Sequence, residues 1–147
     1  MGARGGQYAH RGPMNTGKQR FEMRLGAQPA SVGQLRGNVV EFARDIGFED
    51  TGPIALAVSE ALTNVVLHAY RDTKVGDVRM VACDEPDRLV VVVRDYGDGM
   101  LPRADSPGLG LGLPLISSMA DALQIEAADG AGTLLRMHFM KPVAAAA

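Results

Sequence analysis

Apolar residues recur at helical spacing in two long stretches of the first half of the chain. Over residues 31–46 they follow one another three or four positions apart, with Ser31 as the expected N-cap and Gly47 after the last apolar position. The same spacing runs from residue 50 to about residue 70, with Pro53 in the first turn, where its missing N–H would be unpaired anyway. The pattern therefore predicts two amphipathic helices.

Shorter apolar segments predict strands, and a third helix follows a glycine-rich loop. The strands are expected at 21–25, 77–83, 88–95, 123–128 and 133–139. The third helix is expected from about residue 111 to residue 122. The resulting order is β-α-α-β-β-α-β-β, in which strands joined by short turns pair antiparallel. We therefore expect an α+β fold, a two-layer α/β sandwich whose mixed, mostly antiparallel sheet is covered on one face by three helices.

The ends of the chain differ from its middle in composition. Residues 1–20 hold five glycines, four Lys or Arg and no acidic residue, with almost no apolar residues. Such a segment cannot bury enough apolar surface to offset the entropy lost on ordering. We expect a flexible tail at 1–20, one domain at 21–141 and a frayed terminus at 142–147. A chain of 147 residues is long enough for a single domain with a substantial core.

The overall charge and the residue usage exclude several classes of protein. A formal charge of −2, with only 3 Tyr, 4 Phe and no Trp, does not fit a general nucleic-acid-binding protein. The single cysteine, Cys83, excludes an internal disulfide. No apolar run approaches the roughly 20 residues that span a bilayer, and the N-terminus lacks the apolar core of a secretory signal. We expect a cytoplasmic protein with no membrane or direct nucleic-acid partner.

Glu60, Asn64 and His68 share one face of the second predicted helix, because they are four residues apart. A carboxylate and a carboxamide one turn apart suit Mg²⁺, which prefers a few hard oxygen ligands and keeps substrate phosphates for the rest. Asn64 can bind the metal, and Glu60 can accept a proton from an attacking hydroxyl. The alternative is an ordinary solvated helix face, and His68 fits a structural role at the helix end better than a catalytic one.

Asp95 ends the valine-rich strand and begins the sequence Asp-Tyr-Gly-Asp-Gly. A carboxylate in this position can accept a hydrogen bond from the exocyclic amine of adenine. Gly97 and Gly99 allow a sharp turn and a close approach of the backbone to a flat base. Taken alone, the same sequence is also typical of a tight turn.

Gly108, Gly110 and Gly112 lie just before the third predicted helix, and Leu113 follows them. Free N–H groups and the positive end of a helix dipole bind anions at such a junction. The run lacks the Lys-Ser/Thr pair of a P-loop and has no Rossmann context; a plain hinge is the alternative. Thr133 follows two further glycines and can bring a hydroxyl near a base or phosphates.

Together these three segments resemble the N, G1 and G2 boxes of the GHKL (Bergerat-fold) ATPases, the superfamily of gyrase, the heat-shock chaperone and the histidine kinases. The sequence Ser-Glu-Ala-x-Thr-Asn-x-x-x-His-Ala-Tyr at 59–70 is similar to the anti-sigma-factor serine/threonine kinases of sporulation and stress responses. The resemblance covers about residues 21–140.

The resemblance implies a role for each matching residue. Glu60 would be the general base, Asn64 the Mg²⁺ ligand and Asp95 the reader of adenine, while Arg36 would contact a protein partner. The remaining ATP contacts would come from Gly97, Gly99, Gly108, Gly110, Gly112, Leu113 and Thr133.

The same resemblance implies ATP and Mg²⁺ as cofactors and a homodimer that binds a sigma factor. Its kinase activity would transfer the γ-phosphate of ATP to a serine of a STAS-type anti-anti-sigma protein. Only eight residues separate Gly99 from Gly108, a shorter lid than the sporulation kinases carry. Because phosphoryl transfer depends on positioning and water exclusion, the alternative is a switch that binds ATP without transferring phosphate.

Overall fold

The computed structural model describes residues 10–13, 19–70, 76–97 and 112–143. Six strands form one sheet in the order β1-β2-β3-β4-β6-β5. They are β1 (His10–Pro13), β2 (Gln19–Gly26), β3 (Asp77–Asp84), β4 (Arg88–Asp95), β5 (Ala122–Ala127) and β6 (Thr133–Met140). Every pairing is antiparallel, which narrows the predicted mixed sheet to a purely antiparallel one.

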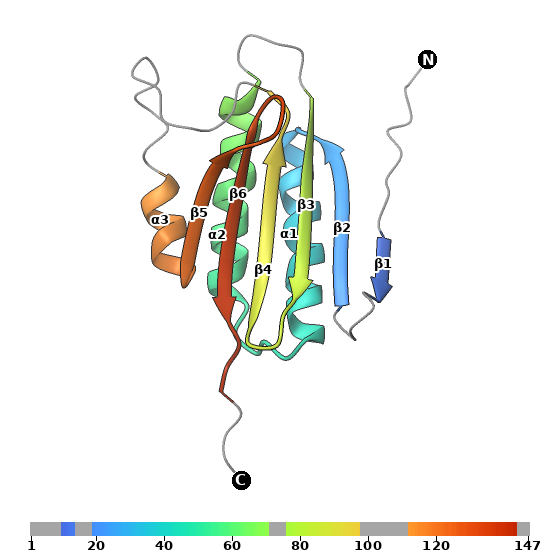
Figure 1. Ribbon diagram of the computed structural model, residues 1–147, viewed down its shortest axis with the longest axis vertical. Coiled ribbons are helices and arrows are strands. Elements are labelled where there is room, and N and C mark those ends of the chain that lie inside the picture. Colours follow the sequence, from blue (N-terminus) through green and yellow to red (C-terminus); the bar gives the residue numbers. More distant parts are fainter. Residues whose placement is uncertain (1–9, 14–18, 71–75, 98–111, 144–147) are drawn as a thin grey trace.

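The helices cover one face of this sheet, as predicted. They are α1 (Pro29–Asp45), α2 (Gly52–Asn64) with its continuation η1 (Val65–Ala69), and α3 (Gly112–Met119). Figure 1 shows α1 and α2 behind the strands, with α3 beside β5. The α2 helix contacts both α1 and α3 and is therefore the central helix of its layer. The predicted two-layer α/β sandwich is confirmed.

The N-terminal region differs from the prediction in one respect. Residues 10–13, placed in a flexible tail, form β1 and pair with β2 from His10 opposite Glu22 to Pro13 opposite Gln19. The segment has no apolar alternation of its own, so its strand conformation depends on the free edge of β2. Proline at the end of an edge strand is tolerated because its missing N–H removes no ladder bond there.

Alternation along the strands sends one set of side chains toward the helices. On β4, Leu89, Val91 and Val93 are fully buried between the sheet and the helices. The helices contribute large, fully buried side chains to the same core, among them Leu35, Phe42, Ile54 and Leu62. Burial of such side chains contributes roughly 1.5–3 kcal/mol each. This core fixes which face of α2 is turned away from the sheet.

The opposite face of the sheet carries arginines around a few valines. Glu22 forms ion pairs with two of them, Arg79 at 2.5 Å and Arg20 at 2.7 Å. These bonds hold the pKa of the Glu22 carboxyl below its usual value, with the Arg79 hydrogen bond as the largest cause. Val81 and Val90 on this face are each only 8% exposed.

Two details of the helices correct the sequence analysis. The first helix begins at Pro29 rather than at Ser31, and the Ser31 hydroxyl donates to the Gly26 carbonyl at 2.5 Å instead of capping the helix. The stretch Gly52–Ala69 is long and apolar enough to cross a membrane by length and composition alone. Its buried residues pack into the core beneath the sheet, as expected for the central helix of a globular fold.

Candidate functional site

The α2 helix holds Glu60 and Asn64 one turn apart, in its C-terminal part. Ala57, Ala61 and Leu62 on the same helix are buried and turn their face toward the core. Glu60 is partly exposed, whereas Asn64 is only 8% exposed. The carboxylate is therefore accessible, and the carboxamide lies in a largely desolvated position.

Directly after Asn64 the helix widens into the π-helical turn η1, Val65–Ala69. The i→i+5 bonding of a π-turn changes the angular position of every later residue. His68 lies inside this turn, so its position relative to Glu60 and Asn64 is set by the π-turn and not by α-helical spacing. Isolated π-turns are frequent at functional sites, and this one immediately follows the two candidate residues.

Asp95 is the last residue of β4, and its side chain is fully buried. Its Oδ1 accepts a hydrogen bond from the Gly97 N–H at 3.0 Å, and its Oδ2 accepts one from the Thr133 N–H at 3.2 Å. Hydrogen bonds to a carboxylate are stronger than those between neutral groups. The two backbone donors therefore fix the plane of the carboxylate.

Glycine is required on both sides of this carboxylate. A Cβ on Gly132 would overlap the Asp95 carbonyl oxygen and lie 3.0 Å from its Oδ1, and Gly132 also has a φ of +99°. A Cβ on Gly97 would overlap the carbonyl oxygen of Ala69. The backbone thus approaches Asp95 closely from the β5–β6 turn, and the turn after β4 approaches the end of η1 just as closely.

These contacts bring two of the three predicted segments together. Gly97 lies against Ala69, the last residue of η1, so the turn after Asp95 meets the helix that carries Glu60 and Asn64. Thr133 is fully buried and reaches Asp95 through its backbone N–H. All of these residues lie at the same end of the sheet, where β4 ends and β6 begins (Figure 1).

The third segment is only partly described. Gly108 and Gly110 of this segment lie outside the described residues, as does Gly99 of the second segment. Gly112 is the first residue of α3, and Leu113 is partly buried against the core. The α3 helix packs on α2, so the start of the glycine-linked helix is held beside the helix of Glu60 and Asn64.

Arg36, predicted to contact a partner, is exposed on α1. Its Nη1 donates to the Ser59 hydroxyl at 3.4 Å. Ser59 immediately precedes Glu60, so this guanidinium lies across the α1–α2 contact from the candidate base.

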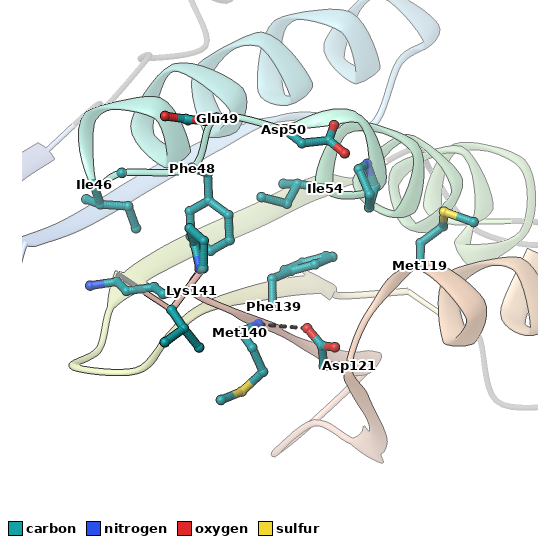
Figure 2. A pocket seen from close by; sticks show the side chains of 14 residues that line it. Ile46, Phe48, Glu49, Asp50, Ile54, Met119, Asp121, Phe139, Met140 and Lys141 are labelled. Atoms are coloured by element: carbon teal, nitrogen blue, oxygen red, sulfur yellow. Dashed lines mark hydrogen bonds between the residues drawn. The ribbon is translucent and has the colours of Figure 1, made fainter. Parts of the chain in front are cut away.

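A hollow of about 840 Å³ opens at the other end of α2. Figure 2 shows Phe48, Ile54 and Phe139 around it, with Asp121 bonded to the Met140 N–H at its edge. Ten residues of helix separate Ile54 from Asn64, a rise of about 15 Å. Of the predicted site residues that the structure describes, none lines this hollow, which is therefore distinct from the site around Asp95.

Tyr70 is a further residue of this site, one to which the sequence motifs assign no role. Its hydroxyl donates to the Asp77 carbonyl at 2.5 Å and accepts from the Tyr96 N–H at 3.0 Å. In the sequence, Tyr70 ends the motif at 59–70 without a role of its own. Glycines at positions 76 and 97 leave room for its ring, but only the fold brings them to the same side chain.

The described residues fit an adenine nucleotide. A buried carboxylate held by two backbone donors can accept a hydrogen bond from an exocyclic amine, and the close backbone packing at Gly97 and Gly132 fixes its position. The Asn64 carboxamide and the Glu60 carboxylate supply hard oxygen atoms of the kind that Mg²⁺ prefers. Among the residues that the structure describes, no cluster of three or more His, Cys, Asp or Glu offers a metal site of another kind.

Comparisons with known proteins agree with this geometry. Residues 25–139 match the family model of the histidine kinase-like ATPase domain. A serine-protein kinase RsbW of Bacillus velezensis is 32% identical over 134 residues, covering 80% of this chain and 84% of that protein. The RsbW of Bacillus licheniformis is 32% identical over 127 residues, covering 75% of this chain and 79% of that protein. The RsbW of Bacillus cereus strain Q1 is 30% identical over 140 residues, covering 84% of this chain and 87% of that protein. The chain therefore belongs to the histidine kinase-like (GHKL) ATPase family and is homologous to the serine-protein kinases named RsbW.

Proposed function

We propose that the protein is an ATP-dependent serine/threonine protein kinase that acts as an anti-sigma factor. It transfers the γ-phosphate of ATP to a serine of a STAS-type anti-anti-sigma protein and, as a homodimer, sequesters a sigma factor. The observation that carries the proposal is the fully buried Asp95 carboxylate, fixed by the Gly97 and Thr133 amides beside the helix of Glu60 and Asn64. The names of its relatives support the kinase activity.

In this proposal each residue has a separate task. Asp95 accepts the adenine amine and so selects ATP over GTP, whose base carries a carbonyl in that position. Asn64 holds Mg²⁺ through its carboxamide oxygen. The bound metal ion would neutralise charge on the phosphates. Glu60, which is partly exposed, receives the proton of the serine hydroxyl as that hydroxyl approaches, a task that a buried carboxylate could not perform for a protein substrate.

The direct test is incubation with labelled ATP, Mg²⁺ and a STAS-type protein, with label on that protein as the expected result. Glu60→Gln should bind ATP within about twofold of the parent but transfer phosphate about 10²–10⁴ times more slowly, the usual contribution of a general base. Glu49→Gln, the same change at an exposed position before α2, should leave both properties unchanged.

The outcomes separate the kinase from its alternative. ATP-dependent sigma-factor binding without label on the STAS protein would establish the binding switch instead. Equal transfer by the parent and by Glu60→Gln would remove Glu60 as the base. An ATP affinity that does not depend on Mg²⁺ would exclude the metal-binding role of Asn64.

A further inference from the structure

We propose that Tyr70 is a positioning residue for nucleotide recognition, one that fixes the Asp95 turn relative to the helix of Asn64. The inference rests on the proposed function, because it assigns Tyr70 a part in binding the adenine of ATP. It is carried by the hydrogen bonds of one hydroxyl, the packing of one ring and the geometry of the turn that leads to it.

The Tyr70 hydroxyl joins three parts of the fold. It donates to the carbonyl of Asp77, the first residue of β3, and accepts from the N–H of Tyr96, which follows Asp95 at the end of β4. A phenol can do both at once because it is a donor and an acceptor. The end of the helix is thus bonded to the β3–β4 pair beside the residue that reads adenine.

One edge of the Tyr70 ring packs against the backbones of two glycines, Gly76 and Gly97. A Cβ on Gly76 would lie 2.5 Å from ring atom Cε1, and a Cβ on Gly97 would lie 2.7 Å from Cδ1. Neither position can carry a side chain while the ring occupies this place. The ring therefore packs directly against both backbones, and its hydroxyl bonds to the Asp77 carbonyl and the Tyr96 N–H.

The π-turn sets the direction of this side chain. Because η1 (Val65–Ala69) lies between Asn64 and Tyr70, Tyr70 leaves the helix at an angle that a continuous α-helix would not give. The widened turn therefore allows one helix to present Asn64 at one angular position and Tyr70 at another.

The consequence for Asp95 follows from consecutive amides. The Tyr96 N–H is bonded to Tyr70, and the next amide, Gly97 N–H, is bonded to Asp95 Oδ1. Without the Tyr70 hydroxyl, Tyr96 N–H and Asp77 C=O both lose a partner and the turn that orients Oδ1 is released. Burial raises the pKa of the Tyr70 phenol, so the hydroxyl keeps its proton throughout the neutral range.

The test compares ATP with tripolyphosphate, each with Mg²⁺, by calorimetric titration of the full chain. Tyr70→Phe should raise the Kd for ATP about tenfold, the equivalent of 1.4 kcal/mol, and leave the Kd for tripolyphosphate unchanged because that probe has no base. Tyr96→Phe is the matched control. Its ring lies 4.3 Å from the Arg24 guanidinium and 4.6 Å from that of Arg94, and Tyr96 contributes only its backbone N–H to the contact with Tyr70.

A double-mutant cycle separates positioning from general support of the fold. If Tyr70 acts through Asp95, Tyr70→Phe should change ATP affinity by less than twofold in an Asp95→Asn background. Additive losses, or equal losses for ATP and tripolyphosphate, would overturn the proposal.

The role of Tyr70 can also be tested on the parent protein, so that the test does not require a substituted protein to fold. ATP should slow hydrogen exchange of the Tyr96 amide at least threefold more than tripolyphosphate does, and equal slowing would refute the role of Tyr70. If the parent binds ATP but Tyr70→Phe binds it equally well, only the positioning role falls. If the parent binds no ATP, the proposed function falls together with it.

Discussion

Replacing Asp95 by Asn tests the centre of the site with almost no change of shape. The substitution turns one acceptor oxygen into an NH₂ donor. Both oxygens of Asp95 accept backbone N–H groups, Oδ1 from Gly97 and Oδ2 from Thr133. Either orientation of the carboxamide therefore places its NH₂ against a backbone N–H, and one donor beside this fully buried side chain loses its acceptor.

The magnitude follows from that lost bond. A buried donor without a partner costs about 1–3 kcal/mol, so the free energy of unfolding of Asp95→Asn should fall by that amount even without nucleotide. The adenine amine also loses a charged acceptor. A further loss of about 1–3 kcal/mol would reduce ATP affinity by about 5–150-fold.

Urea denaturation of the nucleotide-free protein measures the first effect, and titration calorimetry with ATP and Mg²⁺ measures the second. The matched control is Asp87→Asn, the same change on the surface turn between β3 and β4, where Asp87 pairs with Arg88. Its stability should stay within about 0.5 kcal/mol of the parent. If Asp95→Asn kept both the stability and the ATP affinity of the parent, the assignment of Asp95 would be refuted.

Two further predictions concern stability. Gly132→Ala should lower the free energy of unfolding by more than about 2 kcal/mol, because its Cβ would overlap the backbone of Asp95 at a positive φ. Gly37→Ala, at a position with open space in α1, should raise the free energy of unfolding by about 0.5–1 kcal/mol. Urea denaturation that ranked the two variants the other way would contradict the packing. Because Arg79 lowers the pKa of Glu22 from 4.5 in the folded state, the stabilisation by this pair is present above about pH 4.5 and is lost as the pH falls through the lowered folded-state pKa. Denaturation from about pH 6 to about pH 3 should therefore show a smaller loss for Glu22→Gln than for the parent, and equal losses would show that the pair contributes nothing.

Much of the fold could be predicted because local patterns and tertiary burial agree. The continuous apolar run of residues 89–93 predicts a buried strand and becomes the centre of β4, and the helical spacing before Gly47 predicts α1 to within a few residues. Strand β1 could not be predicted, because nothing in the sequence of His10–Pro13 favours an extended chain. Its strand conformation comes from pairing with the free edge of β2.

The candidate site divides in the same way. The motifs identify Glu60, Asn64 and Asp95 because each lies in a short pattern with its own chemistry. The motifs also place Gly97 and Thr133 in the site, but they do not show the backbone hydrogen bonds of these residues to Asp95, and they give Tyr70 no role. Thr133 is 38 positions from Asp95, and the π-turn before Tyr70 keeps an apolar pattern that an α-helix would also satisfy. Only the fold shows that Tyr70 and Gly97 are in contact.

The order of the strands has a consequence for how the chain reaches this structure. Strands β3 and β4, and likewise β5 and β6, are neighbours in the sequence, so each pair forms by closing a short turn. Strand β2 also pairs with β3, with Gly26 opposite Asp77, but helices α1 and α2 lie between these two strands in the sequence. Closing a loop of that length costs about 2 kcal/mol more than closing a tight turn. We therefore expect the two hairpins to form early in folding and β2 to join them late, with a rate limited by the search for that distant edge.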